Sequence, residues 1–223
     1  MSKKLWKKFD GLMRKVKADH VKAIDAVGGH DFLHAVMVAE YAEVIEPNPV
    51  MAGMGWLAGM CHNTDCLFPR MSDQEIKDHI IGNYFSGFAL KKGSMEQIVV
   101  AVLEHSKKNS DSDGLVTVVL KDADRLANIG PPLMIRSGQR YSKLPCFDPR
   151  WILEDDPKSS YRNPRTVLRD VKSSLEWKDG WLRLPKAREI AEKYFVLLQE
   201  YVELMDTQIQ ETNLDQLPEY FLT

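Results

Sequence analysis

Residues 50–61, with the sequence VMAGMGWLAGMC, constrain the fold of this chain more than any other stretch. The segment has no charged side chain, and its hydrophobic residues would cover every side of a helix. A helix that is hydrophobic all round is buried among other elements. Gly53, Gly55 and Gly59 would let neighbouring helices approach it closely. The sequence therefore predicts a helical bundle with residues 50–61 at its centre.

Polar side chains follow this buried segment abruptly, because residues 61–66 read CHNTDC. Burying a polar group without a partner costs about 1–3 kcal/mol. We therefore expect His62 and Asn63 to meet polar partners from other helices at the end of the central helix.

Several other segments have the periodicity or the end signals of helices. Residues 72–75 (SDQE) have the form of a capping box, and residues 94–97 (SMEQ) repeat that signal with Gln. Residues 115–120 could form a strand by propensity alone. We predict a helix there, because the pattern continues to residue 128 before a Gly-Pro-Pro stop. The expected helices cover residues 5–16, 31–45, 50–61, 72–81, 94–103, 115–128, 165–175 and 185–208.

The domain organisation follows from length and composition. A chain of 223 residues with 44% hydrophobic residues can bury a full core. We predict one all-α domain over residues 1–209 and a peripheral tail over residues 210–223. Residues 131–164 are rich in Pro, Gly, Ser and Arg without a clear period, so we expect a lid-like insertion there.

The composition argues against several classes of function. A net charge of −2 gives no general attraction to nucleic acid or to an anionic membrane. No apolar run reaches the roughly 20 residues of a transmembrane helix. The three cysteines lack C-x-x-C spacing, and the first residues, MSKKLWKK, lack the apolar core of a secretory signal. We therefore expect a cytoplasmic protein that binds neither nucleic acid nor membrane.

Histidine spacing points to a metal site. His30 and His34 stand four residues apart, which places both on one face of a helix. His62 ends the central segment, and Asp124 lies near the end of the helix expected over residues 115–128. A mixed imidazole and carboxylate set suits Mn, Fe, Co, Ni or Zn better than Ca.

The order of these residues resembles the HD-domain metal-dependent phosphohydrolase superfamily, and several motifs are similar to its bacterial branch. The matching stretches span most of the chain: HDFLH at 30–34, LAGMCHN at 57–63, DADRL at 122–126 and LPKAREIA at 184–191. The resemblance implies an HD-type helical bundle that hydrolyses a nucleotide or another small phosphate ester. It also implies a divalent cofactor, for which Mn, Fe, Co, Ni, Zn and Mg stay open.

The resemblance also implies roles for individual residues. The expected metal ligands are His34, His62, Asn63 and Asp124. The expected catalytic group comprises His30, Asp31 and His105 by the resemblance, and Asp65 by its spacing of three residues from His62. Apart from the resemblance, their positive charge makes Lys121, Arg125, Arg136 and Arg140 candidate phosphate contacts. Asp122 cannot share the helix face of Asp124, so we expect it to lie on the helix surface or to support the site indirectly.

The sequence departs from the family pattern at two positions. Asn63 stands where the family has the Asp of its His-Asp pair, and Met37 stands where the bacterial branch has Arg. A neutral amide attracts a divalent cation less than a carboxylate does. Asp65 could take over that role if the helix continues past His62; alternatively, it caps the turn before Pro69.

These departures leave two functions open. One is a metal-dependent phosphohydrolase. The other is an HD-fold protein with impaired catalysis that serves as a ligand-binding or regulatory module. In either case the expected partner is a small phosphorylated molecule or nucleotide, and a homodimer stays open.

Overall fold

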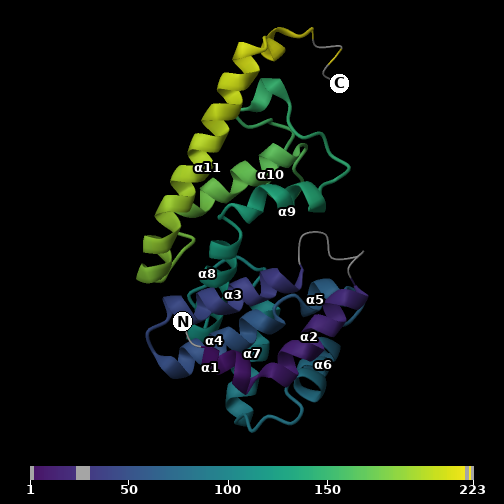
Figure 1. Cartoon of the computed structure of the whole chain (residues 1–223), viewed down its shortest axis with the longest axis vertical. Helices are drawn as coiled ribbons and strands as arrows, with labels where there is room; N and C mark the ends of the chain where they lie inside the picture. The colour runs from purple at the N-terminus through teal and green to yellow at the C-terminus, as the bar shows by residue number, and fades with distance from the viewer. Residues whose placement is uncertain (1–2, 24–30, 219–220, 222–223) are drawn as a thin grey trace.

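The central helix of the computed structural model is α4 (Pro49–Cys61), as the sequence predicts. The structure describes residues 3–23, 31–218 and 221. The side chain of Asn48 accepts hydrogen bonds from the N–H groups of Val50 and Met51, and Pro49 opens the first turn. Helices α3 (Phe32–Ile45), α7 (Lys92–Glu104) and α8 (Leu115–Ala127) pack against α4 (Figure 1).

Two glycines of α4 permit this close packing. A Cβ atom on Gly59 would lie 2.7 Å from both the Cα and the N of Ala39 in α3. A Cβ atom on Gly55 would lie 2.5 Å from Cγ1 of Val119 in α8. Larger residues at these positions would push the three helices apart, so the glycines hold α3 and α8 directly against α4.

Shorter elements complete the chain on both sides of these helices. Ser72 and Glu75 form the predicted capping box at the start of α6. The remaining elements are α1 (Lys3–Lys8), α2 (Asp10–Lys22), α5 (Thr64–Leu67), α6 (Asp73–His79), the π-helix η1 (Ile80–Tyr84), α9 (Pro132–Arg140), η2 (Pro149–Trp151), α10 (Val167–Ser173), η3 (Ser174–Lys178), α11 (Pro185–Glu211) and η4 (Leu214–Gln216).

Helices α9, α10 and α11 lie together beyond the C-terminal end of α8, whereas α1 to α7 gather around α4 (Figure 1). One hydrophobic core nevertheless continues from α4 and α8 through Leu133 to Phe195 and Leu198 of α11. A smaller cluster joins Ile152 and Leu168 to the distal half of α11. The all-α prediction is confirmed, since the described residues form no β-strand. None of the described helices is long and apolar enough to span a membrane.

The structure corrects the predicted element bounds in several places. Residues 131–164 contain the helix α9 and the short η2, where the sequence showed no period. Only Leu133 and Ser137 of α9 are buried, and the Ser137 hydroxyl donates to Asp170 at 2.7 Å. A polar residue thus occupies a buried position of α9 where an amphipathic helix would normally have an apolar one.

Three further helix bounds differ from those predicted from the sequence. The first predicted helix is divided at Phe9. Helix α7 starts at Lys92, so the predicted start signal at residues 94–97 lies within the helix. Helix α11 continues to Glu211, which places the start of the predicted tail within a helix.

Candidate metal centre

His34 enters the site from the first turn of α3. Asp31 precedes this helix as its N-cap, and its Oδ1 accepts the backbone N–H of His34 at 2.8 Å. Asp31 therefore fixes the start of the helix that carries His34. The HDFLH motif thus includes an N-cap signal, although His30 lies outside the described residues.

His62 follows the last turn of α4 and is 1% exposed. Its Nδ1 lies 2.7 Å from the carbonyl oxygen of Gly59 and donates to it, so Nε2 carries a lone pair. That buried Nε2 has no hydrogen-bond partner among the described residues. Burial keeps the pKa of His62 well below its ordinary value, so the ring is neutral at pH 7. A neutral imidazole with an unshared lone pair is a metal ligand.

Asp124 brings a carboxylate from α8 to both rings. Its Oδ1 lies 3.3 Å from Nε2 of His34 and 3.7 Å from Nε2 of His62. The ligand atoms of the three residues all lie within 4.8 Å of one another, so this cluster could hold a metal ion. Burial alone would raise the pKa of Asp124, but the hydrogen bond with His34 and the neighbouring histidines hold it well below its ordinary value. Asp124 is therefore an anion at neutral pH.

Asn63 directly follows His62 in the chain, and a residue of α2 holds its side chain. Its Nδ2 lies 3.2 Å from Nε2 of His20 in α2, and both side chains are buried. Its Oδ1 is buried without a hydrogen-bond partner among the described residues. Asn63 thus has an amide oxygen to offer to an ion.

His105 and Arg136 approach the same centre. The His105 ring lies edge-on to the His62 ring, with centroids 5.4 Å apart, and its Nδ1 lies 2.6 Å from the carbonyl oxygen of Val102. Nη1 of Arg136 donates to Oδ1 of Asn128 at 2.7 Å, and Asn128 in turn donates to Oδ1 of Asp124 at 2.9 Å. Burial lowers the pKa of Arg136, although the nearby Asp124 partly offsets the effect.

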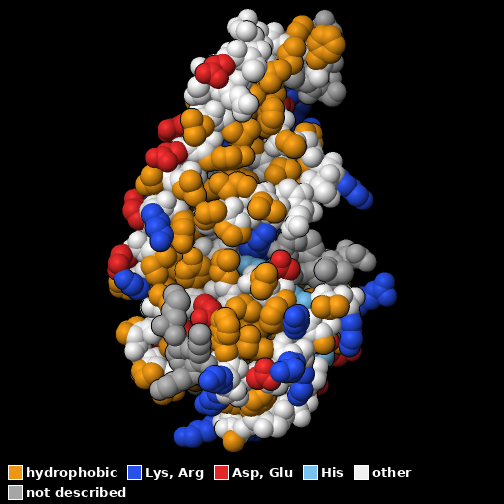
Figure 2. Space-filling model, in the orientation of Figure 1, with side chains coloured by type: hydrophobic (Ala, Val, Ile, Leu, Met, Phe, Trp, Pro, Cys, Tyr) orange, Lys and Arg blue, Asp and Glu red, His pale blue; other side chains and the backbone are white. Residues whose placement is uncertain are grey.

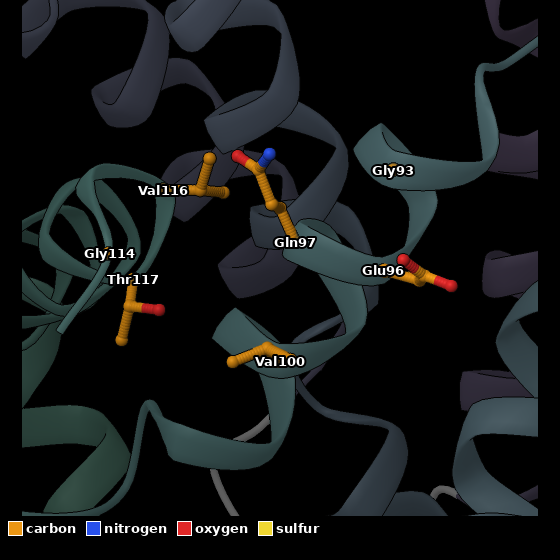
Figure 3. Close-up of a pocket in the computed structure, with 7 residues that line it drawn as sticks. All are labelled: Gly93, Glu96, Gln97, Val100, Gly114, Val116 and Thr117. Atoms are coloured by element: carbon orange, nitrogen blue, oxygen red, sulfur yellow. The ribbon is translucent and has the colours of Figure 1, made fainter. Parts of the chain in front are cut away.

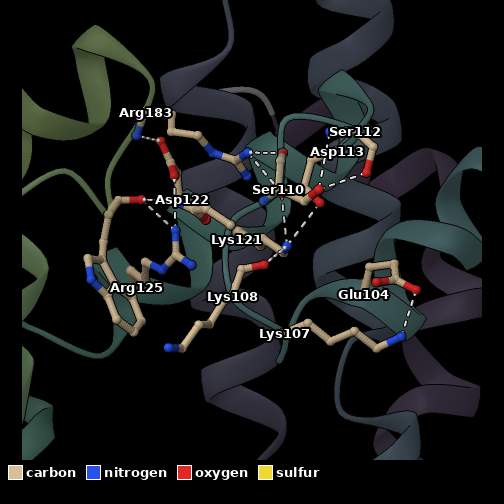
Figure 4. A network of polar contacts seen from close by, with 12 residues as sticks. Glu104, Lys107, Lys108, Ser110, Ser112, Asp113, Lys121, Asp122, Arg125 and Arg183 are labelled. Atoms are coloured by element: carbon tan, nitrogen blue, oxygen red, sulfur yellow. Dashed lines mark hydrogen bonds and ion pairs between the residues drawn. The ribbon is translucent and has the colours of Figure 1, made fainter.

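The predicted phosphate contacts divide into two groups. Lys121 is 1% exposed, and its Nζ donates to both oxygens of Asp113 and to the carbonyl oxygen of Lys108 (Figure 4). Arg125 donates to the carbonyl oxygen of Trp181 at 2.6 Å, and its guanidinium lies 5.2 Å from the centroid of that indole ring. Both cations are therefore engaged in packing and ion pairs, and their role as phosphate contacts stays a prediction.

Of the two cations of α9, Arg136 lies near the site. Arg136 is connected to Asp124 through Asn128, as described above. Arg140 lies one turn further along, with its guanidinium 5.5 Å from the ring centroid of Tyr141. Both stand on an ordered helix rather than on an irregular lid.

The structure places two carboxylates for which the sequence left two alternatives open, Asp65 and Asp122. Asp65 lies in the first turn of α5, and its Oδ1 accepts the backbone N–H of Cys66, so it supports a short helix and lies outside the metal cluster. Asp122 is fully buried rather than on the helix surface. Its Oδ2 accepts the N–H groups of Arg183 and Leu184 at 2.7 Å each, which ties α8 to the start of α11.

Sequence reasoning gave two contributors no role in the site. Asn128 stands four residues after Asp124, so helix periodicity could have placed it on the same face. His20 had no such signal, because its partner Asn63 is far away in the sequence and only the tertiary fold brings them together.

The surroundings locate the centre in the molecule. Figure 2 shows histidine side chains, with Lys, Arg, Asp and Glu beside them, where the bundle meets α9. A separate hollow of about 310 Å³ lies between α7 and α8, and Figure 3 shows Gln97 and Val116 beside it. It is lined by none of the predicted site residues.

The fold is similar to solved bacterial structures. No protein-family model matches the sequence, and no curated protein matches it. Bacillus subtilis YpgQ, crystallised in complex with ADP, superposes with a TM-score of 0.61 at 17% identity, over 89% of this chain and 97% of YpgQ. A Lactobacillus plantarum protein superposes with a TM-score of 0.64 at 15% identity, over 90% of this chain and 97% of the other chain. A Listeria innocua protein superposes with a TM-score of 0.57 at 18% identity, over 90% of this chain and 97% of the other chain. At this identity the likeness establishes the fold.

Proposed function

We propose that this protein is a metal-dependent phosphohydrolase of the HD-domain type that acts on a nucleotide or another small phosphate ester. The observation that carries the proposal is the convergence of His34, His62 and Asp124, whose ligand atoms lie within 4.8 Å of one another. The buried Nε2 of His62 lacks a hydrogen-bond partner among the described residues, and its place beside a second imidazole and a carboxylate favours a cation as the partner.

The donor set fits a borderline divalent ion. Two imidazole nitrogens and a carboxylate, with the amide oxygen of Asn63 beside them, suit Mn, Fe, Co, Ni or Zn, and Mg stays open. When bound, such an ion acidifies water and offsets the negative charge of phosphoryl oxygens. The chain's own contribution is to hold its ligands in fixed orientations through Gly59, Asp31 and Asn128.

The charge of the site favours an anionic substrate. With both histidines neutral, the ligand set carries only the single negative charge of Asp124. A divalent cation would leave this set with a net positive charge, and Arg136 adds another cation nearby. Phosphate oxygens would balance both charges. The ADP bound to YpgQ supports a nucleotide among the candidates.

His105 is placed to exchange a proton with the substrate. Its Nδ1 is committed to the carbonyl oxygen of Val102, which leaves Nε2 to accept or return a proton. Its ring contacts that of His62 edge-on, so the group lies beside the cluster without belonging to it. We assign it a proton transfer in which Nε2 would first accept a proton from the attacking water and then deliver it to the leaving oxygen.

Metal analysis and turnover together test this function. The purified protein should retain a divalent metal that His34→Ala and His62→Ala each remove. With Mn, Co, Ni or Mg added, it should hydrolyse ADP or p-nitrophenyl phosphate, and turnover should fall in the same variants. Equal metal content in wild type and variants would refute the metal centre.

Asn63 supports a second candidate, an HD-fold binding or regulatory module without catalysis. The amide supplies no negative charge where the resembling family has a carboxylate. Hydrolysis that emerges only in Asn63→Asp would favour this module. Turnover by the wild type that falls in His34→Ala would exclude it.

A further inference from the structure

His20 of α2 contacts Asn63, the residue that follows the candidate ligand His62. Its Nδ1 lies 2.8 Å from the carbonyl oxygen of Val16, four residues earlier in the helix. Its Nε2 lies 3.2 Å from Nδ2 of Asn63. The ring also packs edge-on against Phe32, with centroids 6.1 Å apart. His20 is 5% exposed and Asn63 1%, so water does not compete for these contacts.

The direction of these hydrogen bonds fixes the amide of Asn63. A carbonyl oxygen accepts only, so Nδ1 of His20 is the donor to Val16. In the neutral ring Nε2 is then an acceptor, and it must face the NH₂ group of Asn63. The opposite amide orientation would need a proton on both ring nitrogens, which means a buried imidazolium. Oδ1 of Asn63 is therefore the atom turned away from His20.

That oxygen has no hydrogen-bond partner among the described residues, although it is buried. An unsatisfied buried carbonyl costs about 1–3 kcal/mol, so this oxygen calls for an ion or an ordered water as its partner. Its neighbour His62 likewise has a buried Nε2 without a hydrogen-bond partner there. The two atoms belong to consecutive residues at the end of α4.

We propose that His20 is a positioning residue of the metal centre: by accepting the Asn63 N–H it directs Oδ1 of Asn63 toward the cation held by His34, His62 and Asp124. This inference rests on the proposed metal centre. It also gives a reason for Asn at position 63, because a carboxylate has no N–H to donate to Nε2 of His20. His20 and Asn63 thus form a matched pair in place of the family's carboxylate.

Cobalt binding tests the pair without any turnover measurement. Metal-free protein is titrated with Co²⁺ and followed by calorimetry and by the visible spectrum, which reports the ligand set. His20→Leu removes the acceptor and should weaken Co²⁺ binding about 10- to 100-fold, as expected for loss of a residue that orients a ligand. His20→Gln restores an acceptor oxygen and should stay within about threefold of wild type.

A double-mutant cycle separates positioning from a general structural role. If His20 acts through Asn63, Asn63→Ala and the double variant Asn63→Ala/His20→Leu should bind Co²⁺ equally. His79→Leu is the matched control, because His79 contacts Asp19 of the same helix and has no contact with Asn63. The proposal would be overturned if His20→Leu weakened Co²⁺ binding equally in the wild-type and Asn63→Ala proteins. It would also be overturned if His20→Leu did not weaken Co²⁺ binding in the wild-type protein.

Nitrogen-15 NMR of the wild type covers the case in which a variant fails to fold. His20 should show the Nδ1–H tautomer, and its Nε2 resonance should shift in Asn63→Ala. A proton on Nε2 would overturn the hydrogen bond itself. Wild-type protein that binds no Co²⁺ would refute the metal centre along with this role. Co²⁺ binding that depends on His20 without any hydrolysis would refute only the proposed hydrolase.

Discussion

Nε2 of His34 lies 3.3 Å from Oδ1 of Asp124, although one residue opens α3 and the other lies near the end of α8. The same Oδ1 accepts a hydrogen bond from Asn128, one turn later in α8. These contacts hold one carboxylate oxygen between two helices. A change at Asp124 should therefore affect metal binding before it affects the fold.

Asp124→Asn should lower the affinity for Mn²⁺ at least about 100-fold, since it removes the one anionic ligand while keeping the shape of the side chain. The amide can still accept from Asn128, so the melting temperature should change little. Calorimetric titration of metal-free protein measures the affinity. Asp111→Asn removes an exposed carboxylate and should bind Mn²⁺ as wild type does. Unchanged affinity in Asp124→Asn would contradict the assignment.

Asp113→Asn should destabilise the protein by about 3 kcal/mol at pH 7, because it leaves Lys121 buried without its anion. Burial by itself raises the pKa of Asp113, but hydrogen bonds from Lys121, Ser110 and Arg183 outweigh it and hold the pKa below its usual range. Because the folded pKa is depressed, the stabilisation is present above the unfolded value of about 3.9. It is lost as the pH falls through the folded pKa.

The difference in unfolding free energy between wild type and Asp113→Asn should therefore be constant from pH 7 down to about pH 5 and then shrink. Urea unfolding at a series of pH values measures it. Asp111→Asn again serves as the control, since that exposed residue should show a difference near zero. A difference that grows as the pH falls would contradict the depressed pKa.

Arg136→Ala should raise KM for a phosphate ester about tenfold or more, because one charge-assisted contact contributes about 1.5–3 kcal/mol. Steady-state kinetics with p-nitrophenyl phosphate, together with competition by inorganic phosphate, separates binding from turnover. Arg162→Ala removes an exposed arginine from the stretch between η2 and α10 and should leave KM unchanged. An unchanged KM in Arg136→Ala would remove this residue from the substrate site.

The central helix could be predicted because residues 50–61 are apolar on all sides, and only a buried helix accommodates that pattern. The order of His34, His62 and Asp124 likewise predicted the cluster, because it resembles the order of metal ligands in a known superfamily. Lys121 and Arg125 could not be placed in the same way. Whether these two cations bind a substrate or a protein group depends on their partners, Asp113 and Trp181. Both partners lie in irregular segments, and hydrophobic periodicity does not predict the position of such segments.

Helix α9 shows the other limit of sequence reasoning. A helix is recognised by its apolar stripe, but α9 buries Ser137 where that stripe should continue. The hydrogen bond from Ser137 to Asp170 of α10 replaces a hydrophobic contact. Local sequence cannot show such a pairing, because the partner belongs to a distant helix.

Gly59→Ala should cost about 2 kcal/mol or more and should weaken metal binding in the folded fraction. The new Cβ would lie 2.7 Å from the backbone of Ala39, so α3 and α4 must separate, and these helices carry His34 and His62. Gly53→Ala is the matched control on the same helix. Its Cβ would meet nothing within 4 Å, and the gain in helix propensity should stabilise the protein by about 0.5–1 kcal/mol. Urea unfolding and Mn²⁺ titration of both variants measure the two effects. If Gly59→Ala is as stable as Gly53→Ala and binds Mn²⁺ equally well, the close approach of α3 and α4 does not set the distance between the two histidines.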